Sequence, residues 1–212
     1  MSDGIYHTVG QGESLASIAE HYRFSWRALW NHPSNADLKR LRRNPNILLP
    51  GDSVFVPAKT AEEVSCATDR RHRFLRRGVP SRIQMRLLAH DVPRRNIRCV
   101  LDVDGSLSEV TTDNNGCLSI VVPPTARSAR LRVGDGDGAQ QFAIAVGNLN
   151  PITEISGVQG RLRNLGIRCP SSGQWDEGTQ QAVRAFQAKH DLCQTGEMDE
   201  DTRNRLREVH GS

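Results

Sequence analysis

The sequence lacks the features that would assign the chain to a membrane or to a nucleic acid. No apolar run approaches the length of about 20 residues that crosses a bilayer, and the start, Met1-Ser2-Asp3-Gly4, is polar and unlike a secretory signal. The net charge is only +4, which offers no large basic surface for nucleic acid. We expect no membrane span, no nucleic-acid partner, and synthesis in the cytoplasm without a signal peptide. Delivery to the periplasm or cell envelope would then use a non-classical route.

The cysteines and histidines are also sparse and scattered. The five cysteines include no Cys-x-x-Cys pair, which fits a reducing compartment better than a disulfide scaffold. Free thiols are favoured, with the pairs Cys99–Cys117, on candidate neighbouring strands, and Cys169–Cys193 as the alternative in an oxidising compartment. The seven histidines form no His-Glu-x-x-His zinc motif, and no segment holds a Cys–His unit or the paired carboxylates of a lysozyme-type enzyme. We expect a protein that is not an enzyme and that needs no metal or cofactor.

The spacing of the apolar residues changes twice along the 212 residues of the chain. A mixed segment comes first, a segment of period two follows, and a segment of helical period ends the chain. We predict an N-terminal domain over residues 1–58, a linker over 59–78, a β-sandwich domain over 79–150 and a three-helix domain over 151–212. The predicted fold class is therefore multi-domain α+β.

The N-terminal segment contains a strand, two helices and a second strand. Strands are predicted at residues 5–9 and 53–57, and Ser14 and Ser25 can each cap a helix. This order resembles the βααβ LysM family over about residues 5–58. The resemblance is carried by Tyr6, Thr8, Val9, Gly12-Glu13-Ser14-Leu15, Ile18-Ala19, Tyr22, Leu29, Pro50-Gly51-Asp52 and Val56-Pro57. The insert at residues 31–43, with one or two extra helical turns, resembles LysM domains found beside spike proteins of contractile injection machines such as type VI secretion systems.

The LysM resemblance implies a shallow groove for a glycan of N-acetylated sugars. Its walls here would be two loops, which consist of Gly12, Glu13, Ser14 and Leu15, and of Asn46, Ile47 and Leu48. Gly12 would let the backbone approach the sugar, while Ile47 and Leu48 would offer apolar contact. The alternative is that Leu15 and Ile47 belong mainly to the core, and for Leu15 we favour the core.

The middle segment alternates between apolar and polar residues, with turn residues between its strands. The predicted strands are Ile83–Ala89, Ile97–Val103, Ser106–Thr112, Cys117–Val122, Ala129–Val133 and Gln140–Val146. Short strands at this spacing predict a small β-sandwich. The turn at Thr112–Leu118 resembles that of Ig-like or prealbumin-like accessory domains.

The C-terminal segment returns to helical spacing. Gly166 is predicted to end the first helix, Thr179 to open the second and Asp199 to cap the third. The segment resembles the peptidoglycan-binding domain of cell-wall hydrolases over about residues 155–209. The resemblance is carried by Val158-Gln159, Leu162, Leu165-Gly166, Gly173, Trp175, Thr179, Ala182-Val183, Phe186-Gln187, Leu192, Thr195-Gly196, Asp199, Thr202 and Leu206.

The same resemblance implies a ligand cleft near Gly173, Trp175 and Thr179. Trp175 would be its platform, although a core position for Trp175 is the favoured alternative. The chain departs from the family at Ser172, where the family has Asp, and at Asp176, where it has a second Gly.

Two functions fit these resemblances. The first is a non-enzymatic peptidoglycan-binding protein, which anchors or accompanies secreted cargo. The alternative is a structural or adaptor protein of a contractile injection apparatus, which contacts a spike or effector protein instead of glycan.

Overall fold

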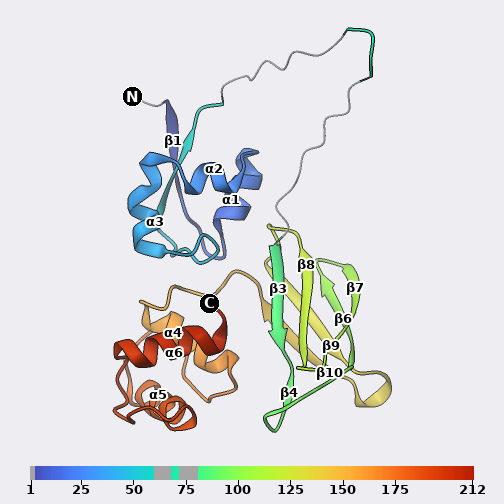
Figure 1. The fold of residues 1–212 in the computed structure, drawn as a ribbon, viewed down its shortest axis with the longest axis vertical. Coiled ribbons are helices and arrows are strands. Elements are labelled where there is room, and N and C mark those ends of the chain that lie inside the picture. Colours follow the sequence, from blue (N-terminus) through green and yellow to red (C-terminus); the bar gives the residue numbers. More distant parts are fainter. Residues whose placement is uncertain (1–2, 60–67, 72–80) are drawn as a thin grey trace. The chain divides into compact units, whose positions relative to one another are not determined.

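The computed structural model describes residues 3–59, 68–71 and 81–212, and the chain forms two compact units, Met1–Asn148 and Leu149–Ser212 (Figure 1). Within the described residues the fold is mixed, with six α-helices and several small antiparallel sheets. This confirms the predicted mixture of α and β structure. Of the predicted linker, the structure describes residues 59 and 68–71. Cys66 lies outside the described residues.

The N-terminal part of the first unit consists of helices packed on a two-stranded sheet. Its elements are β1 (Gly4–Thr8), α1 (Leu15–Tyr22), α2 (Trp26–Trp30), a 3₁₀ turn (Pro33–Asn35), α3 (Ala36–Arg42) and β2 (Ser53–Pro57). β1 and β2 pair antiparallel from Gly4 opposite Pro57 to Thr8 opposite Ser53. Leu15, Ile18, Leu29 and Val54 lie in one core with less than 2% of each residue exposed. The predicted strand–helix–helix–strand order is present, and the extra helical turns of the insert are the 3₁₀ turn and α3.

Two buried polar contacts fix the insert against β2. The side-chain amide of Asn35 donates to the backbone oxygens of Leu29 and Phe55, each at 2.9 Å, and its oxygen accepts from the Phe55 N–H at 2.7 Å. Arg42 at the end of α3 forms a bidentate ion pair with Asp52, with both hydrogen bonds at 2.8 Å and both side chains only 8% exposed. A buried pair of this kind needs both partners, so the turn before β2 depends on the helix of the insert.

The second part of the first unit contains strands of three sheets, two of which surround one core. Its strands are β3 (Ser81–Arg86), β4 (Leu88–Ala89), β5 (Val92–Pro93), β6 (Arg98–Val103), β7 (Ser106–Thr111), β8 (Cys117–Val122), β9 (Ser128–Val133) and β10 (Gln140–Ala145), with a 3₁₀ turn at Gly136–Gly138. The order in the larger sheet is β10-β9-β6-β7, and β3 pairs with β8. Alternate residues of both sheets, among them Leu101, Leu118 and Leu131, fill the shared core.

One detail of this region corrects the sequence analysis. Cys99 lies on β6, which pairs with β7 and β9, whereas Cys117 lies on β8, which pairs with β3. The two cysteines therefore do not lie on neighbouring strands, because β8 belongs to the other sheet. Both are free, as are Cys169 and Cys193.

The second unit consists of three helices, α4 (Ile155–Asn164), α5 (Glu177–Lys189) and α6 (Glu200–His210). Leu162, Val183, Phe186 and Leu206 form the centre of its core. The second helix begins at Glu177 and not at Thr179 as predicted, because the Asp176 side chain is the N-cap and accepts the Thr179 N–H. Asp199 caps the third helix as predicted.

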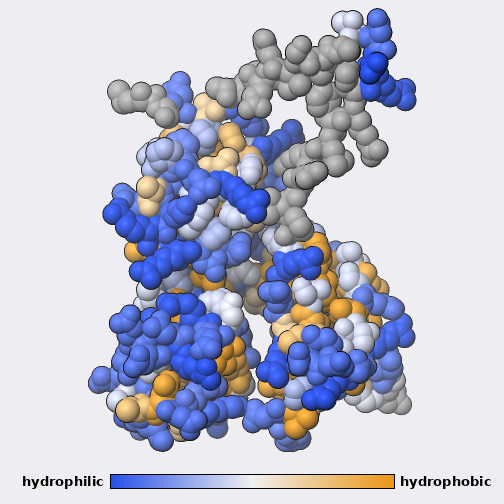
Figure 2. Space-filling model, in the orientation of Figure 1, coloured by the Kyte–Doolittle hydropathy of each residue, from blue (hydrophilic) through white to orange (hydrophobic). Residues whose placement is uncertain are grey.

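On the face drawn in Figure 2, hydrophilic side chains predominate and hydrophobic ones form only small patches.

Candidate functional site

The site in the C-terminal unit is built on a loop between α4 and α5. We name residues 172–179 the first loop. The buried side chain of Gln159 on α4 holds this loop: its amide nitrogen donates to Ser172 Oγ at 3.1 Å, the Gln174 carbonyl at 3.0 Å and Thr179 Oγ1 at 2.8 Å. Its oxygen accepts the Gly173 N–H at 2.9 Å. Gly173 has φ +69°, a conformation that glycine adopts without strain.

A second loop between α5 and α6 repeats this arrangement. We name residues 195–202 the second loop. Gln187 on α5, which is fully buried, donates to Thr195 Oγ1 at 3.1 Å, the Glu197 carbonyl at 3.0 Å and Thr202 Oγ1 at 3.0 Å, and it accepts the Gly196 N–H at 2.9 Å. Each bond has a counterpart in the first loop. The sequences SGQWDEGT and TGEMDEDT therefore form the same structure twice.

In each loop an aspartate caps the following helix, whose first turn is counted here with the loop. Asp176 Oδ1 accepts the Thr179 N–H at 2.8 Å, and Asp199 Oδ1 accepts the Thr202 N–H at 2.7 Å. The Thr179 hydroxyl, followed by Ser172, lowers the pKa of Asp176, and the Thr202 N–H and hydroxyl lower the pKa of Asp199. Both caps therefore stay ionised well into the acid range.

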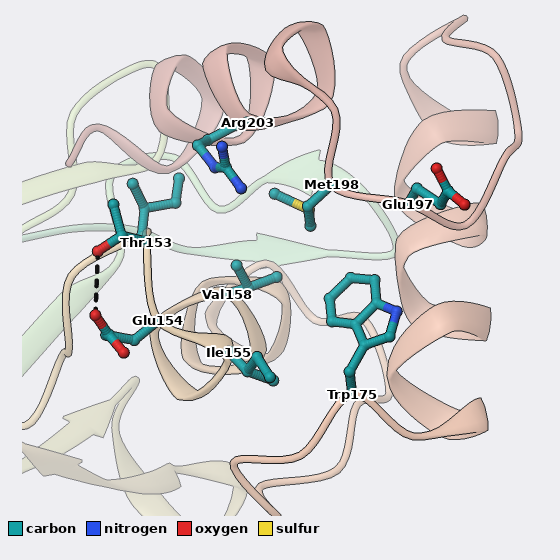
Figure 3. Close-up of a pocket in the computed structure, with 9 residues that line it drawn as sticks. Thr153, Glu154, Ile155, Val158, Trp175, Glu197, Met198 and Arg203 are labelled. Atoms are coloured by element: carbon teal, nitrogen blue, oxygen red, sulfur yellow. Dashed lines mark hydrogen bonds between the residues drawn. The ribbon is translucent and has the colours of Figure 1, made fainter.

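A cleft of about 310 Å³ opens between the two loops and the start of α4 (Figure 3). It is lined by Ile152, Thr153, Glu154, Ile155, Val158, Trp175, Glu197, Met198 and Arg203. Trp175 and Met198 stand at corresponding positions of the two loops, and both also pack against the core. The Thr153 hydroxyl donates to Glu154 Oε1 at 3.3 Å. The volume is at the lower end for ligand pockets, and the mixture of apolar walls and a few charges is typical of them.

The three C-terminal residues predicted from sequence differ in their relation to this cleft. Trp175 lines it and also packs against the core. Gly173 and Thr179 are not among the lining residues. They hold the first loop in place through Gln159.

The predicted N-terminal groove residues lie on two loops that a backbone hydrogen bond holds together. The Leu15 N–H donates to the Pro45 carbonyl at 2.9 Å, which brings the loop before α1 next to the loop before β2. Leu15 and Leu48 are buried in the core, as favoured for Leu15, while Asn46 is exposed and Ile47 is half-buried. Only Asn46 and Ile47 of the second wall therefore have side chains that a ligand can reach readily.

The other wall of the predicted groove is occupied by structural hydrogen bonds. Ser14 Oγ accepts the Ser17 N–H in the capping box of α1. Glu13 accepts the Gly10 N–H and a bond from His7 Nε2, both at 2.8 Å, and His7 Nδ1 lies 3.1 Å from the Tyr22 hydroxyl. Burial opposes ionisation of Glu13, but these hydrogen bonds and the His7 charge outweigh it and lower its pKa. Gly12 has φ +78°, so any side chain there is strained.

Within the described residues, no group of three or more His, Cys, Asp or Glu side chains could hold a metal ion.

A second cleft, of about 430 Å³, lies beside β1 and the end of α1, where it is lined among others by Ile5, Tyr22 and Phe24. No helix in the described part of the chain is long and apolar enough to cross a membrane.

Comparison with known families identifies one region of the chain. Residues 153–206 match the family described as "Putative peptidoglycan binding domain". The match contains both loops and all of the nine cleft residues except Ile152. No curated protein and no solved structure matches the chain.

The sequence resemblance includes Gln159, Gln187 and parts of the loop that holds Met198, but it implies no place in the site for them. The repeat of Gly-x-x-Asp-x-x-Thr at residues 173–179 and 196–202, each after a buried helical Gln, was the signal that could have revealed them. Arg203 carried no such signal, because a lone arginine on a polar helix face is indistinguishable from a solvated one.

Proposed function

We propose that this chain is a non-enzymatic peptidoglycan-binding protein, and that its C-terminal domain meets the wall at the cleft between Trp175 and Met198. The observation that carries the proposal is the coincidence of the family match with the cleft: residues 153–206 contribute nearly the whole lining. The two Gln-held loops give the cleft a rigid rim, which reduces the entropy lost on binding. A cleft of this size supports weak binding, on the order of micromolar to millimolar.

Retention of the full chain on purified peptidoglycan sacculi tests the proposal. Trp175→Ala removes the largest apolar wall, and Ile155→Glu puts a charge into the cleft at the first residue of α4, where an acidic side chain suits the helix dipole. Each change should weaken retention about tenfold. Gln181→Ala, an exposed change on α5, is the matched control and should bind as the parent does. Circular dichroism of each variant establishes that the helices are intact.

The N-terminal part is proposed to add a LysM-like glycan contact through Asn46 and Ile47. Ile47→Asp should then reduce retention further in the background of Trp175→Ala, because two modules on one chain bind the same wall cooperatively. Equal retention of the single and double variants would leave the C-terminal cleft as the only contact.

One observation favours an adaptor that contacts protein through the N-terminal part. Ile5 and Tyr6 on β1 are 53% and 66% exposed, and exposed apolar residues beside a cleft are typical of protein interfaces. A parent protein that sacculi do not retain, with a spike or effector protein that does bind it, would favour this second function.

A further inference from the structure

The cleft contains a polar atom whose bonding is incomplete. Arg203 Nε is buried and, in the described part of the chain, has no hydrogen-bond partner. A buried donor without a partner destabilises the folded state, so its place in a folded domain calls for an explanation.

The other arginines nearby are satisfied. Arg161, which is almost fully buried, donates to the carbonyl oxygens of Ser212, Asn150 and Gly157 at 3.1, 2.8 and 2.8 Å. On α6 itself, Arg205 pairs with Glu208 at 2.8 Å and Arg207 donates to Asn204 at 3.0 Å. The missing partner is thus a property of Arg203, the arginine of α6 that lines the cleft.

Arg203 is the basic residue among those that line the cleft, where Glu154 and Glu197 are the acidic ones. Figure 3 shows its guanidinium directed into the space near Val158 and Met198. Val158 and Met198 are apolar, and beside apolar groups a charge-assisted hydrogen bond is stronger than it is in water. A guanidinium presents its N–H groups as a planar fork that matches a carboxylate with two parallel hydrogen bonds.

We infer that Arg203 binds a carboxylate of the wall's stem peptide, so that the cleft recognises the peptide and not the glycan. This inference rests on the proposed function and deepens it. The N-acetylated sugars themselves are neutral, whereas the stem peptide carries free carboxylates and small apolar side chains that suit the walls at Ile155, Trp175 and Met198. Glu197, which also lines the cleft, can accept from an amide or ammonium group of the same peptide.

Calorimetry on the full chain with defined soluble probes tests this assignment. The probes are the tripeptide L-Ala-γ-D-Glu-meso-diaminopimelate, the same tripeptide with its carboxylates converted to carboxamides, and a hexamer of N-acetylglucosamine. We expect the parent to bind the free-acid tripeptide at least tenfold more tightly than the amidated form. Arg203→Gln should lose at least tenfold in affinity for the free acid and bind both tripeptides equally.

Two further variants keep the result interpretable. Arg203→Lys retains the charge but not the fork, and should recover only part of the affinity. Arg205→Gln removes the same charge two residues along the same helix, where the side chain pairs with Glu208, and should change the affinity less than twofold. Should Arg203→Gln unfold, the comparison of free-acid and amidated tripeptide on the parent still decides the matter.

The outcomes separate the inference from the proposed function. If sacculi retain the parent and lose Trp175→Ala, but Arg203→Gln binds the free-acid tripeptide as the parent does, the carboxylate assignment is wrong and peptidoglycan binding stands. Parent binding to neither tripeptide, or binding of the sugar hexamer that Arg203→Gln weakens, also overturns the assignment. If sacculi do not retain the parent at all, the proposed function fails as well.

Discussion

The two loops of the C-terminal domain share a framework but differ in what they present to the cleft. In both, a buried Gln satisfies one N–H, one carbonyl and two hydroxyls, and an Asp caps the next helix. The residues between these fixed points are Gln174-Trp175 in the first loop and Glu197-Met198 in the second. The framework thus holds the backbone, and Trp175, Glu197 and Met198 are left to line the cleft.

The largest effect is expected from removing either glutamine. Gln187→Ala leaves the Gly196 N–H, the Glu197 carbonyl and two hydroxyls without their partner, and Gln159→Ala does the same in the first loop. Each should cost about 3 kcal/mol of unfolding free energy, since buried polar groups that lose partners cost about 1–3 kcal/mol each and some regain water.

Amide hydrogen exchange on the full chain locates this effect. In Gln159→Ala the Gly173 N–H should exchange much faster while the Gly196 N–H stays protected, and Gln187→Ala should reverse the pattern. Gln181→Ala, with an exposed amide on α5, is the control and should change stability by less than about 0.5 kcal/mol. Equal acceleration at both glycines in either variant would mean that the loops are one cooperative unit and not two copies.

Each of the helices that follow the two loops ends near a histidine. These two histidines predict how the stability of the domain changes as the pH falls. Burial lowers the pKa of His190 and, together with the Arg161 charge, lowers that of His210 to about 4. The ordinary value is about 6.5. As the pH falls, the unfolded chain is therefore protonated before the folded domain, so stability is lost between about pH 6.5 and 4.

His210→Asn should flatten this pH dependence more than His190→Asn, because burial and the Arg161 charge lower the pKa of His210 to about 4. Asn also keeps a polar group near Asn164 and Ser212, which bond to the His210 ring. Exchange of α6 amides between pH 7 and 4.5 measures the effect. The aspartate caps ionise below this range, so they do not contribute to it. An equally steep loss of stability in His210→Asn would show that another group carries the proton linkage.

Sequence patterns predicted the elements of this protein better than its contacts. Alternation gave most strands of the middle region, with Cys117–Val122 correct at both ends, because a strand with one buried face must alternate. The strand predicted at Ile83–Ala89 is instead divided into β3 and β4, and β5 was not predicted. The start of α5 was placed at Thr179 and not Glu177, since the pattern of apolar residues carries no information on a cap such as Asp176.

The candidate site was predicted only in part for a related reason. Trp175 could be identified as a large apolar side chain in a loop, but whether Thr179 faces ligand or core depends on Gln159, which lies far away in sequence. Arg203 gave no signal, because the isolation of its Nε arises only from the packing around it. Polar networks across long sequence separations are what periodicity cannot reveal.

Exchanging the variable positions of the loops tests their assignment to the ligand. Trp175→Met gives the first loop the side chain of the second, and should weaken sacculus retention about tenfold with little loss of stability, since Met fills partly buried space adaptably. Met198→Trp should keep or strengthen retention by adding apolar area to the opposite wall. Retention that is unchanged in Trp175→Met would place the ligand away from the cleft.

The smallest effect concerns a hydrogen bond of the first loop, between Ser172 and Asp176. Ser172 Oγ donates to Asp176 Oδ2 at 2.7 Å. This bond is the second largest cause of the lowered pKa of Asp176, after the bond from the Thr179 hydroxyl. Thr195, in contrast, is not among the causes that lower the pKa of Asp199. Ser172→Ala should therefore raise the pKa of Asp176 toward its ordinary value, and Thr195→Ala should leave that of Asp199 unchanged. Because a depressed carboxyl pKa contributes stability that is lost as the pH falls through it, Ser172→Ala should bring the acid unfolding of the domain to a slightly higher pH. Titration of the two carboxyl carbons by NMR on the full chain reports both pKa values directly. A shift at Asp199 in Thr195→Ala, equal to that at Asp176 in Ser172→Ala, would show that the loops are alike even here, and that the cleft side chains alone distinguish them.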